Sequence, residues 1–191
     1  MTYSKHDLIG QELEADEVTS AWERFKNDLA KRRKLTLSID VPALLLLRCR
    51  SLVRMIEDDS FEHEVSDVFD ILIDQWKQQY AKTVDPARMA GSLRAMQEKV
   101  INYYTGERSL FRRDTGRKRA TKIVIPYDSL LDLEFICESL TSAYNEEGII
   151  FTVEGVLSTL FVDFMNRIQK GDIKNLARIL SAHAREVESS A

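Results

Sequence analysis

The sequence predicts a mostly helical protein built from two copies of one short strand–helix–helix unit. A shift of 88 positions aligns residues 34–77 with residues 122–165 without a gap, and nine of the 44 aligned pairs are identical. Those pairs are Lys34/Lys122, Asp40/Asp128, Leu45/Leu133, Cys49/Cys137, Ser51/Ser139, Leu52/Leu140, Val65/Val153, Val68/Val156 and Leu72/Leu160. Because one such unit is too small to bury its own apolar face, the repeat predicts two copies sharing one core.

The composition is that of an ordinary globular protein. The chain has 191 residues, of which 44% are hydrophobic and 30% charged. Two cysteines do not make a disulfide framework, so we expect a cytoplasmic protein. We find no apolar run of membrane-spanning length, no phosphate-binding glycine loop and no metal-ligand spacing. The sequence therefore predicts a protein that is not an enzyme, has no membrane partner and needs neither a cofactor nor a metal.

Positive charge gathers next to the start of each copy. The net charge is −4, but residues 31–34 are all basic. Residues 107–122 hold seven basic side chains against two acidic ones, a balance of +5. Two clusters placed alike relative to the repeat favour contact with nucleic acid, although a solvated face would explain each cluster alone.

The first copy begins with a strand. Residues 35–39 alternate apolar and polar side chains, as a half-buried strand does. Asp40 is expected to cap the helix over residues 41–57, with Pro42 in its first turn. A second helix is predicted over residues 65–82. The expected inward positions of the two helices are Leu45, Cys49, Leu52, Ile56, Val65, Val68, Phe69, Leu72, Ile73 and Trp76.

The second copy repeats this order. The strand is expected at residues 123–125, limited by Pro126, with Asp128 as the next helix cap. Residues 145–148 form the turn before a helix capped by Thr152. The expected inward positions are Leu133, Cys137, Leu140, Tyr144, Val153, Val156, Leu157, Leu160, Phe161 and Phe164.

Helical patterns also surround and connect the copies. The predicted organisation is an N-terminal helical extension, a first repeat, a linking helix with a basic loop, a second repeat and a C-terminal helix. These parts cover residues 1–30, 31–82, 83–116, 117–170 and 171–191.

A strand followed by two helices, preceded by basic residues, resembles the ribbon-helix-helix fold of Arc-type repressors. Residues 65–73 and 153–161 look like the start of that family's second helix. The tandem arrangement is similar to conjugative-plasmid accessory proteins that carry two such units. The resemblance implies a ribbon-helix-helix pseudo-dimer with additional helices, in which the two strands pair antiparallel.

The resemblance also implies sequence-specific binding of double-stranded DNA, as a transcriptional repressor or a plasmid or phage accessory factor. In that family the ribbon enters the major groove and its outward side chains contact base edges. The corresponding base-contacting residues here are Lys34, Thr36, Ser38, Lys122 and Val124. The residues expected to contact phosphates are Lys31, Arg32, Arg33, Arg112, Arg113, Arg117, Lys118 and Arg119.

The sequence leaves two alternatives open. The same fold without DNA readout would be a protein-interaction adaptor that docks a partner through its terminal helices. The copies could also pair between two chains, giving a homodimer in place of a monomer with an internal pseudo-twofold.

The charge at the start of each second helix departs from the family pattern, in which the helix N-terminus often binds a phosphate. Glu64, Asp67 and Glu154 lie at these positions and would repel a phosphate there.

Overall fold

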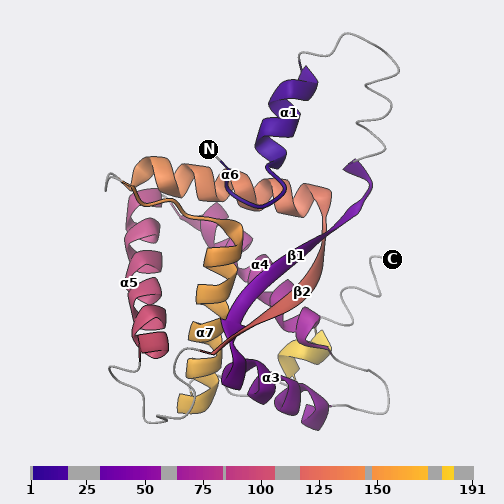
Figure 1. The fold of residues 1–191 in the computed structure, drawn as a ribbon, viewed down its shortest axis with the longest axis vertical. Helices are drawn as coiled ribbons and strands as arrows, with labels where there is room; N and C mark the ends of the chain where they lie inside the picture. Colours follow the sequence, from indigo (N-terminus) through magenta and orange to yellow (C-terminus); the bar gives the residue numbers. More distant parts are fainter. Residues whose placement is uncertain are drawn as a thin grey trace.

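The computed structural model describes residues 2–16, 31–56, 64–83, 85–105, 117–144, 148–171 and 178–182. Over these residues the chain is mostly helical, with one small two-stranded antiparallel sheet. Figure 1 shows this sheet as a twisted ribbon that lies against the helices. Among the described helices, none is long and apolar enough to cross a membrane.

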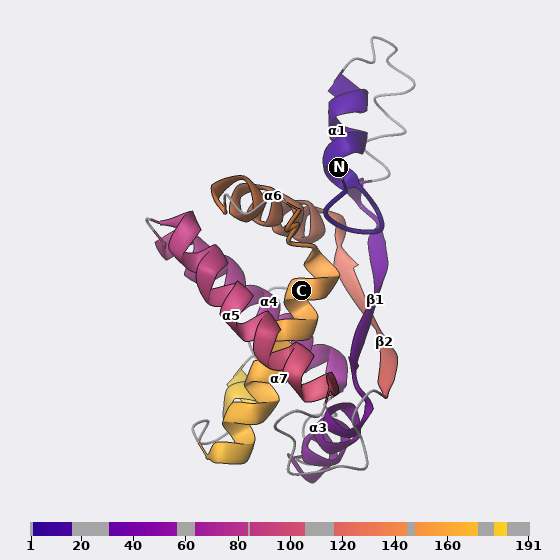
Figure 2. The same ribbon diagram turned by 60° about the vertical axis from the view of Figure 1, so that its left-hand side comes forward.

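The ribbon is formed by β1 (Lys34–Pro42) and β2 (Lys118–Pro126). Lys34 lies opposite Pro126, Thr36 opposite Val124 and Pro42 opposite Lys118. The two strands are therefore paired along their whole length although about 80 residues of chain separate them. In Figure 2 the ribbon is seen nearly edge-on, with the helices packed behind one of its faces.

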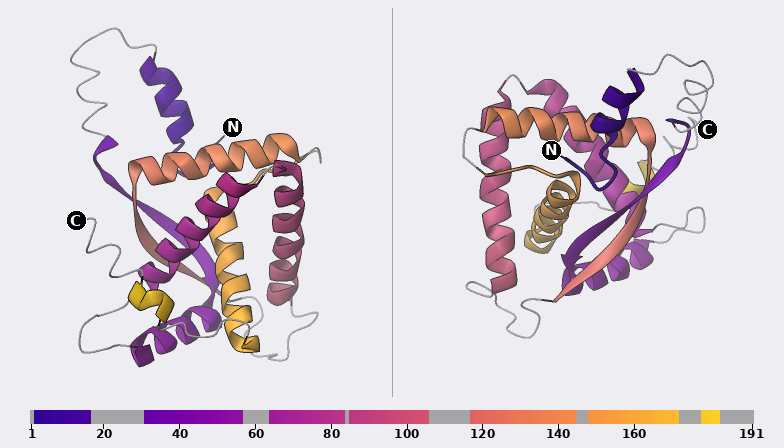
Figure 3. Two further views of the ribbon diagram at one scale, coloured as in Figure 1. Left: turned by 180° about the vertical axis from the view of Figure 1, so that it is seen from behind. Right: turned by 45° about the horizontal axis from the view of Figure 1, so that its top comes forward.

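Each strand leads into two helices. β1 is followed by α3 (Ala43–Ile56) and α4 (Val65–Lys82), and β2 by α6 (Tyr127–Ala143) and α7 (Val153–Lys170). α3 and α6 lie at opposite ends of the ribbon, whereas α4 and α7 lie behind it (Figures 1 and 3). The predicted linking helix is α5 (Pro86–Thr105), which packs on α6 and α7.

One core joins the elements of both halves. The rings of Phe69 on α4 and Phe161 on α7 stack with centroids 5.2 Å apart. The predicted inward residues of the four helices are buried or packed against this core, so the helical patterns are confirmed. On α3 the buried face is displaced slightly from the predicted stripe, because Leu46 and Val53 are buried whereas Leu52 and Ile56 are only partly covered.

The predicted strand ends and two helix caps are wrong. β1 continues through Asp40 and Pro42, and α3 begins only at Ala43. β2 begins at Lys118 and runs through Pro126, and α6 already begins at Tyr127, so Asp128 lies inside that helix. Neither Asp40 nor Asp128 is a helix cap.

The hydrogen-bonding pattern of the ribbon explains why both prolines are tolerated. The Ala43 N–H donates to the Arg117 carbonyl (3.1 Å), and the Tyr127 N–H donates to the Arg33 carbonyl (3.2 Å). Bonding groups alternate sides along a strand, so Pro42 and Pro126 occupy positions whose backbone nitrogen points away from the other strand. A proline there removes no hydrogen bond between the strands.

The N-terminal extension is attached to the second half of the chain. Within it, α1 spans Leu8–Asp16, and the remainder of the predicted helix lies outside the described residues. The buried carboxylate of Glu134 accepts hydrogen bonds from the Ser4 hydroxyl and from the Ile9 N–H (2.9 Å). These contacts hold residues 4–9 against α6.

A second set of contacts holds the same extension to the start of α6. The Tyr127 hydroxyl and the Lys31 ammonium each donate to the Glu12 carboxylate at 2.8 Å. Burial raises the pKa of Glu12, but the hydrogen bonds from Lys31 and Tyr127 outweigh it and bring the pKa below its ordinary value of 4.5. Burial, followed by the hydrogen bond to Glu12, raises the pKa of the Tyr127 hydroxyl.

Some predicted parts fall outside the described residues. They include the basic loop at residues 106–116, and with it Arg112 and Arg113. Of the predicted C-terminal helix, residues 178–182 are described and helical, with Leu180 buried.

Candidate nucleic-acid interface

The face of the ribbon turned away from the helices carries all five predicted base-contacting residues. Lys34 and Thr36 on β1, and Lys122 and Val124 on β2, are exposed, and Ser38 is partly exposed. Val124 keeps 55% of its surface accessible. The ribbon thus presents a mostly polar surface, on which the apolar outward side chains are Ala120, Val124 and Pro126 of β2.

The opposite face of the ribbon is closed by the core. Leu37, Ile39, Ile123 and Ile125 are at most 2% exposed, and Leu35 packs against the core. The inward and outward assignment of the predicted strand residues is therefore confirmed. It follows from the two-residue period of a strand, which sends successive side chains to opposite faces.

Cross-strand pairing brings the outward residues together in rows. Thr36 lies opposite Val124, and Ser38 lies opposite Lys122. The next outward row, Asp40 opposite Ala120, was not part of the predicted site. The alternating pattern of residues 35–39, extended by one residue, indicates Asp40 as an outward residue, whereas its capping preference favours the start of a helix.

Basic residues lie at both ends of the ribbon. Arg32 and Arg33 are exposed just before β1, and residues 117–119 are exposed at the start of β2. Because the strands are antiparallel, the two groups are separated by about 27 Å, the length of eight strand steps. Lys31 differs from the other predicted phosphate contacts, because its ammonium group is paired with Glu12 at 2.8 Å.

The chain's own N-terminal residues lie along the outer edge of β1. The His6 ring nitrogen Nε2 is 3.1 Å from the Thr36 carbonyl oxygen, and the Ser158 hydroxyl donates to the Asp40 carbonyl at 2.6 Å. The first N–H of α7, that of Val153, donates to the Tyr3 carbonyl at 2.8 Å. This edge of β1 is thus held by the N-terminal segment and by the start of α7.

At the starts of both second helices, several amides are hydrogen-bonded within the protein. At α7 the Thr152 hydroxyl accepts from the Gly155 N–H at 3.2 Å. At α4 the Glu64 N–H donates to the Asp67 carboxylate (2.8 Å), and the Asp67 N–H donates to the Glu64 carbonyl (3.2 Å). The amides used in this way are not free to bind a phosphate, and Glu64, Asp67 and Glu154 add negative charge at these helix starts.

The two cysteines belong to the core and not to the outward face of the ribbon. Cys49 and Cys137 are free thiols, buried as predicted, and burial raises the pKa of Cys49 to about 12. Within the part of the chain that the structure describes, no three His, Cys, Asp or Glu side chains are grouped to hold a metal ion.

Comparison with known proteins adds no relative. No family model matches the chain, and no curated protein or solved structure is significantly similar to it. Any statement about function therefore depends on the residues of the ribbon and their surroundings.

Proposed function

We propose that this chain is a single-chain ribbon-helix-helix pseudo-dimer that binds double-stranded DNA with the exposed face of its β1–β2 ribbon. Its role would be that of a transcriptional repressor or a plasmid or phage accessory factor. The observation that carries the proposal is the uncovered ribbon face with Lys34, Thr36, Ser38, Lys122 and Val124. A two-stranded ribbon fits the major groove of B-form DNA, where every base pair presents a distinct pattern.

The strand register supports a twofold relation between the copies. A twofold axis through a ribbon places one residue of each copy opposite its own equivalent. The 88-residue shift maps Thr36 onto Val124, and these two residues lie opposite each other. The same shift relates Lys34 to Lys122 and Ser38 to Pro126, and the observed pairs are Lys34 with Pro126 and Ser38 with Lys122. The packing is reciprocal as well, since α7 lies on β1 and α4 on β2.

The outward side chains can discriminate bases. Lysine donates to guanine O6 and N7, threonine and serine bond to more than one base edge, and the Val124 methyl groups suit a thymine methyl. Asp40 on the same face can accept from the amino group of cytosine. Because the rows on either side of the Thr36–Val124 pair carry different side chains, we expect a target site that is not palindromic.

The basic residues at the ribbon ends would contact phosphates. Arg32, Arg33, Arg117, Lys118 and Arg119 are exposed and flank the outward face. Such contacts add affinity that does not depend on sequence and that falls steeply as salt rises. Lys31 contributes less in this scheme, because Glu12 already neutralises it.

The test begins with selection of bound duplexes from a random pool, followed by footprinting of the enriched site. Thr36→Ala and Lys34→Ala should then weaken cognate binding by about 1–3 kcal/mol each, roughly 5- to 150-fold, and weaken random-duplex binding much less. Lys82→Ala, which removes an exposed lysine at the end of α4, is the matched control for Lys34→Ala. Equal losses on cognate and random duplexes would contradict base readout by these side chains.

A second candidate function is the adaptor on the same fold. It is favoured by Leu13 on α1, which is 65% exposed on an acidic helix and would suit a partner protein. Gel-shift assays with genomic fragments at ~50 and ~200 mM salt separate the two functions, because phosphate-mediated binding must fall steeply between these concentrations. Absence of binding at both concentrations would favour the adaptor.

Assembly is tested by solution mass. The pairing of β1 with β2 within one chain supports a monomer of 22.0 kDa. A monomer in solution would exclude pairing of the copies between two chains.

A further inference from the structure

We propose that the cavity between α3, β2 and the start of α4 binds a phosphate group of the DNA backbone through arginine side chains. This inference rests on the proposed DNA-binding function and adds a contact that the sequence did not indicate. The decisive feature is that α3 brings two arginines to the edge of the ribbon, 68 and 72 residues before Lys122 in the chain.

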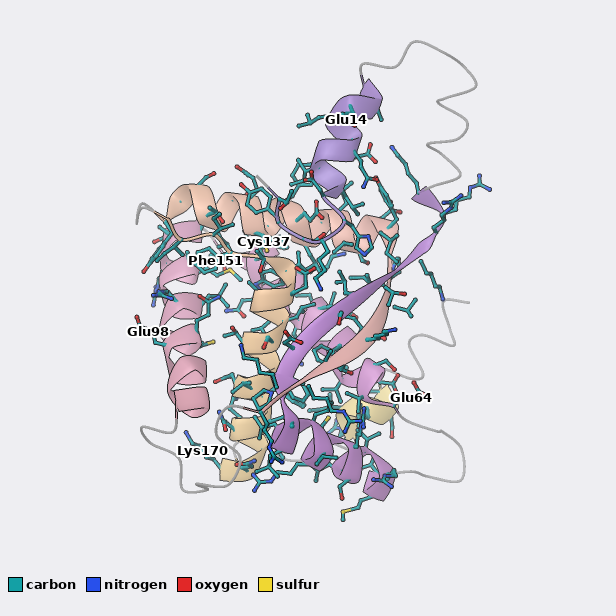
Figure 4. All side chains as sticks on the ribbon, in the orientation of Figure 1. Glu14, Glu64, Glu98, Cys137, Phe151 and Lys170 are labelled. Atoms are coloured by element: carbon teal, nitrogen blue, oxygen red, sulfur yellow. The ribbon has the colours of Figure 1, made fainter. Side chains whose placement is uncertain are left out.

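The cavity has the size and charge for such a group. Its volume is about 400 Å³, and the charged side chains that line it are Arg50, Arg54, Lys122 and Glu64. Three cations and one carboxylate give the lining a balance of +2. The hydroxyl groups of Ser66 and Thr121, with Val53 and Val65, complete the wall. Figure 4 labels Glu64 at the start of α4, at the level of the lower part of the ribbon.

The cations of this cavity are available to a ligand. Among the described residues, none forms an ion pair with Arg50, Arg54 or Lys122. The Arg54 Nε donates to the Arg50 backbone carbonyl at 3.3 Å, and the spacing of four residues places the two arginines on the same side of α3. A guanidinium group presents several N–H donors in a plane and binds phosphate oxygens two at a time.

The one carboxylate in the lining is already hydrogen-bonded. The Ser66 hydroxyl donates to Glu64 Oε2 at 3.2 Å. Because the Glu64 and Asp67 amides are bonded within the cap of α4, we assign the main donors for an anion here to the arginine and lysine side chains. This distinguishes the cavity from a phosphate site made by a helix N-terminus.

The cavity lies beside the residues proposed to contact bases. Lys122 both lines the cavity and lies opposite Ser38 on the outward face of the ribbon. It is two residues from Val124, a distance of about 7 Å along the strand. A phosphate held by Arg50 and Arg54 would therefore flank the groove that the ribbon enters.

The corresponding edge of β1 differs in charge. A cavity of about 490 Å³ there is lined by Lys5 and Lys118 together with Asp40 and Glu154, so that its charges balance. The N-terminal segment forms part of its wall. We therefore expect a tighter phosphate contact at the edge of β2 than at the edge of β1. The protein would then bind the backbone of one DNA strand more tightly than that of the other.

The first experiment measures duplex binding by fluorescence anisotropy as a function of salt. The double variant R50A/R54A is compared with K82A/R88A, which removes the same charge from exposed residues at the α4–α5 connection, far from the ribbon (Figure 2). We expect R50A/R54A to weaken cognate and random duplexes alike, by about tenfold at ~100 mM salt, and to reduce the salt slope by about 1. If R50A/R54A bound both duplexes as K82A/R88A does, the phosphate contact of the cavity would be overturned. The proposal that the ribbon binds DNA would not be affected.

The second experiment separates this inference from the proposed function. Inorganic phosphate is titrated into the 191-residue protein, and the arginine Nε–H and backbone amide signals are followed by ¹H–¹⁵N NMR. Saturable shifts of Arg50, Ser66 and Lys122 that are lost in R50A/R54A are expected. If these shifts were observed but the wild-type protein bound no duplex, the cavity would be a site for free phosphate, and its proposed role in DNA binding would be overturned. If no signal shifted, the cavity would not be an anion site. A circular dichroism melt of each variant confirms that it is folded.

Discussion

Truncation of Phe161 tests whether the two halves of the chain share one core. Phe161 on α7 is fully buried, and its ring stacks on Phe69 of α4 with an angle of 9° between the planes. The two residues come from helices that lie in different halves of the chain. If the copies were independent units, removal of this contact would affect only one of them.

The expected magnitude follows from the burial and from the ring pair. A buried Phe→Ala change costs about 3–5 kcal/mol, of which the aromatic pairing contributes about 0.5–1.5 kcal/mol. A protein of this size has about 5–15 kcal/mol of total stability, so Phe161→Ala removes a large share. The melting temperature should fall by roughly 10 °C, since about 2–4 °C is lost per kcal/mol in chains of this length.

The assay is urea unfolding of Phe161→Ala, of Phe69→Ala and of the double variant, followed by circular dichroism. Phe135→Ala is the control, because this phenylalanine on α6 is 50% exposed and its removal should cost little. The double variant should be more stable than the sum of the single losses predicts, by the pair energy of about 0.5–1.5 kcal/mol. A loss below about 1 kcal/mol for Phe161→Ala, or two separate unfolding transitions, would refute the shared core.

Three further predictions concern local features. Cys49 and Cys137 should not react with a thiol reagent in the native protein, because both are buried and burial raises the pKa of each thiol. Both should react after denaturation, and rapid labelling of the native protein would contradict their burial. Gly171→Ala should destabilise α7 by about 1 kcal/mol in a thermal melt, because Gly171 has φ +76°, a left-handed backbone conformation that residues with a side chain rarely adopt. The control Gly91→Ala lies within α5, where an added methyl group meets no other atom, and it should be neutral or stabilising in the same melt. Because the pKa of Glu12 is lower in the folded protein than its ordinary value of 4.5, the ionised carboxylate stabilises the attachment of α1 at pH values above 4.5. This stabilisation is lost as the pH falls through the pKa of the folded state, so amide hydrogen exchange of α1 should become faster there. Glu12→Gln should abolish this acid dependence.

Local pattern determined much of the fold. The helices, their buried faces and the inward and outward sides of each strand follow from the periods of apolar residues, which local chain geometry sets. The 88-residue repeat also indicated which outward residues would share the ribbon face. These features need no knowledge of what each element packs against.

The ends of the strands were not predictable in the same way. β1 extends over residues 40–42 because β2 supplies partners there, from Lys118 to Ala120, and pairing overrides the capping preference of Asp40. The attachment of residues 3–6 to α6, α7 and β1 likewise depends on groups about 30 to 150 residues away.

The sequence by itself determined the buried faces of the helices and the outward residues of the two strands. Only the tertiary structure decided how far the strands pair and which side chains meet beside them. The cavity shows this most clearly. Arg50 and Arg54 look like ordinary surface residues of a helix in the sequence, and they become neighbours of Lys122 only because the packing of α3 beside β2 brings distant segments together. Side-chain groups formed by such packing have no local signal, since their spacing along the chain is unrelated to their distance in space.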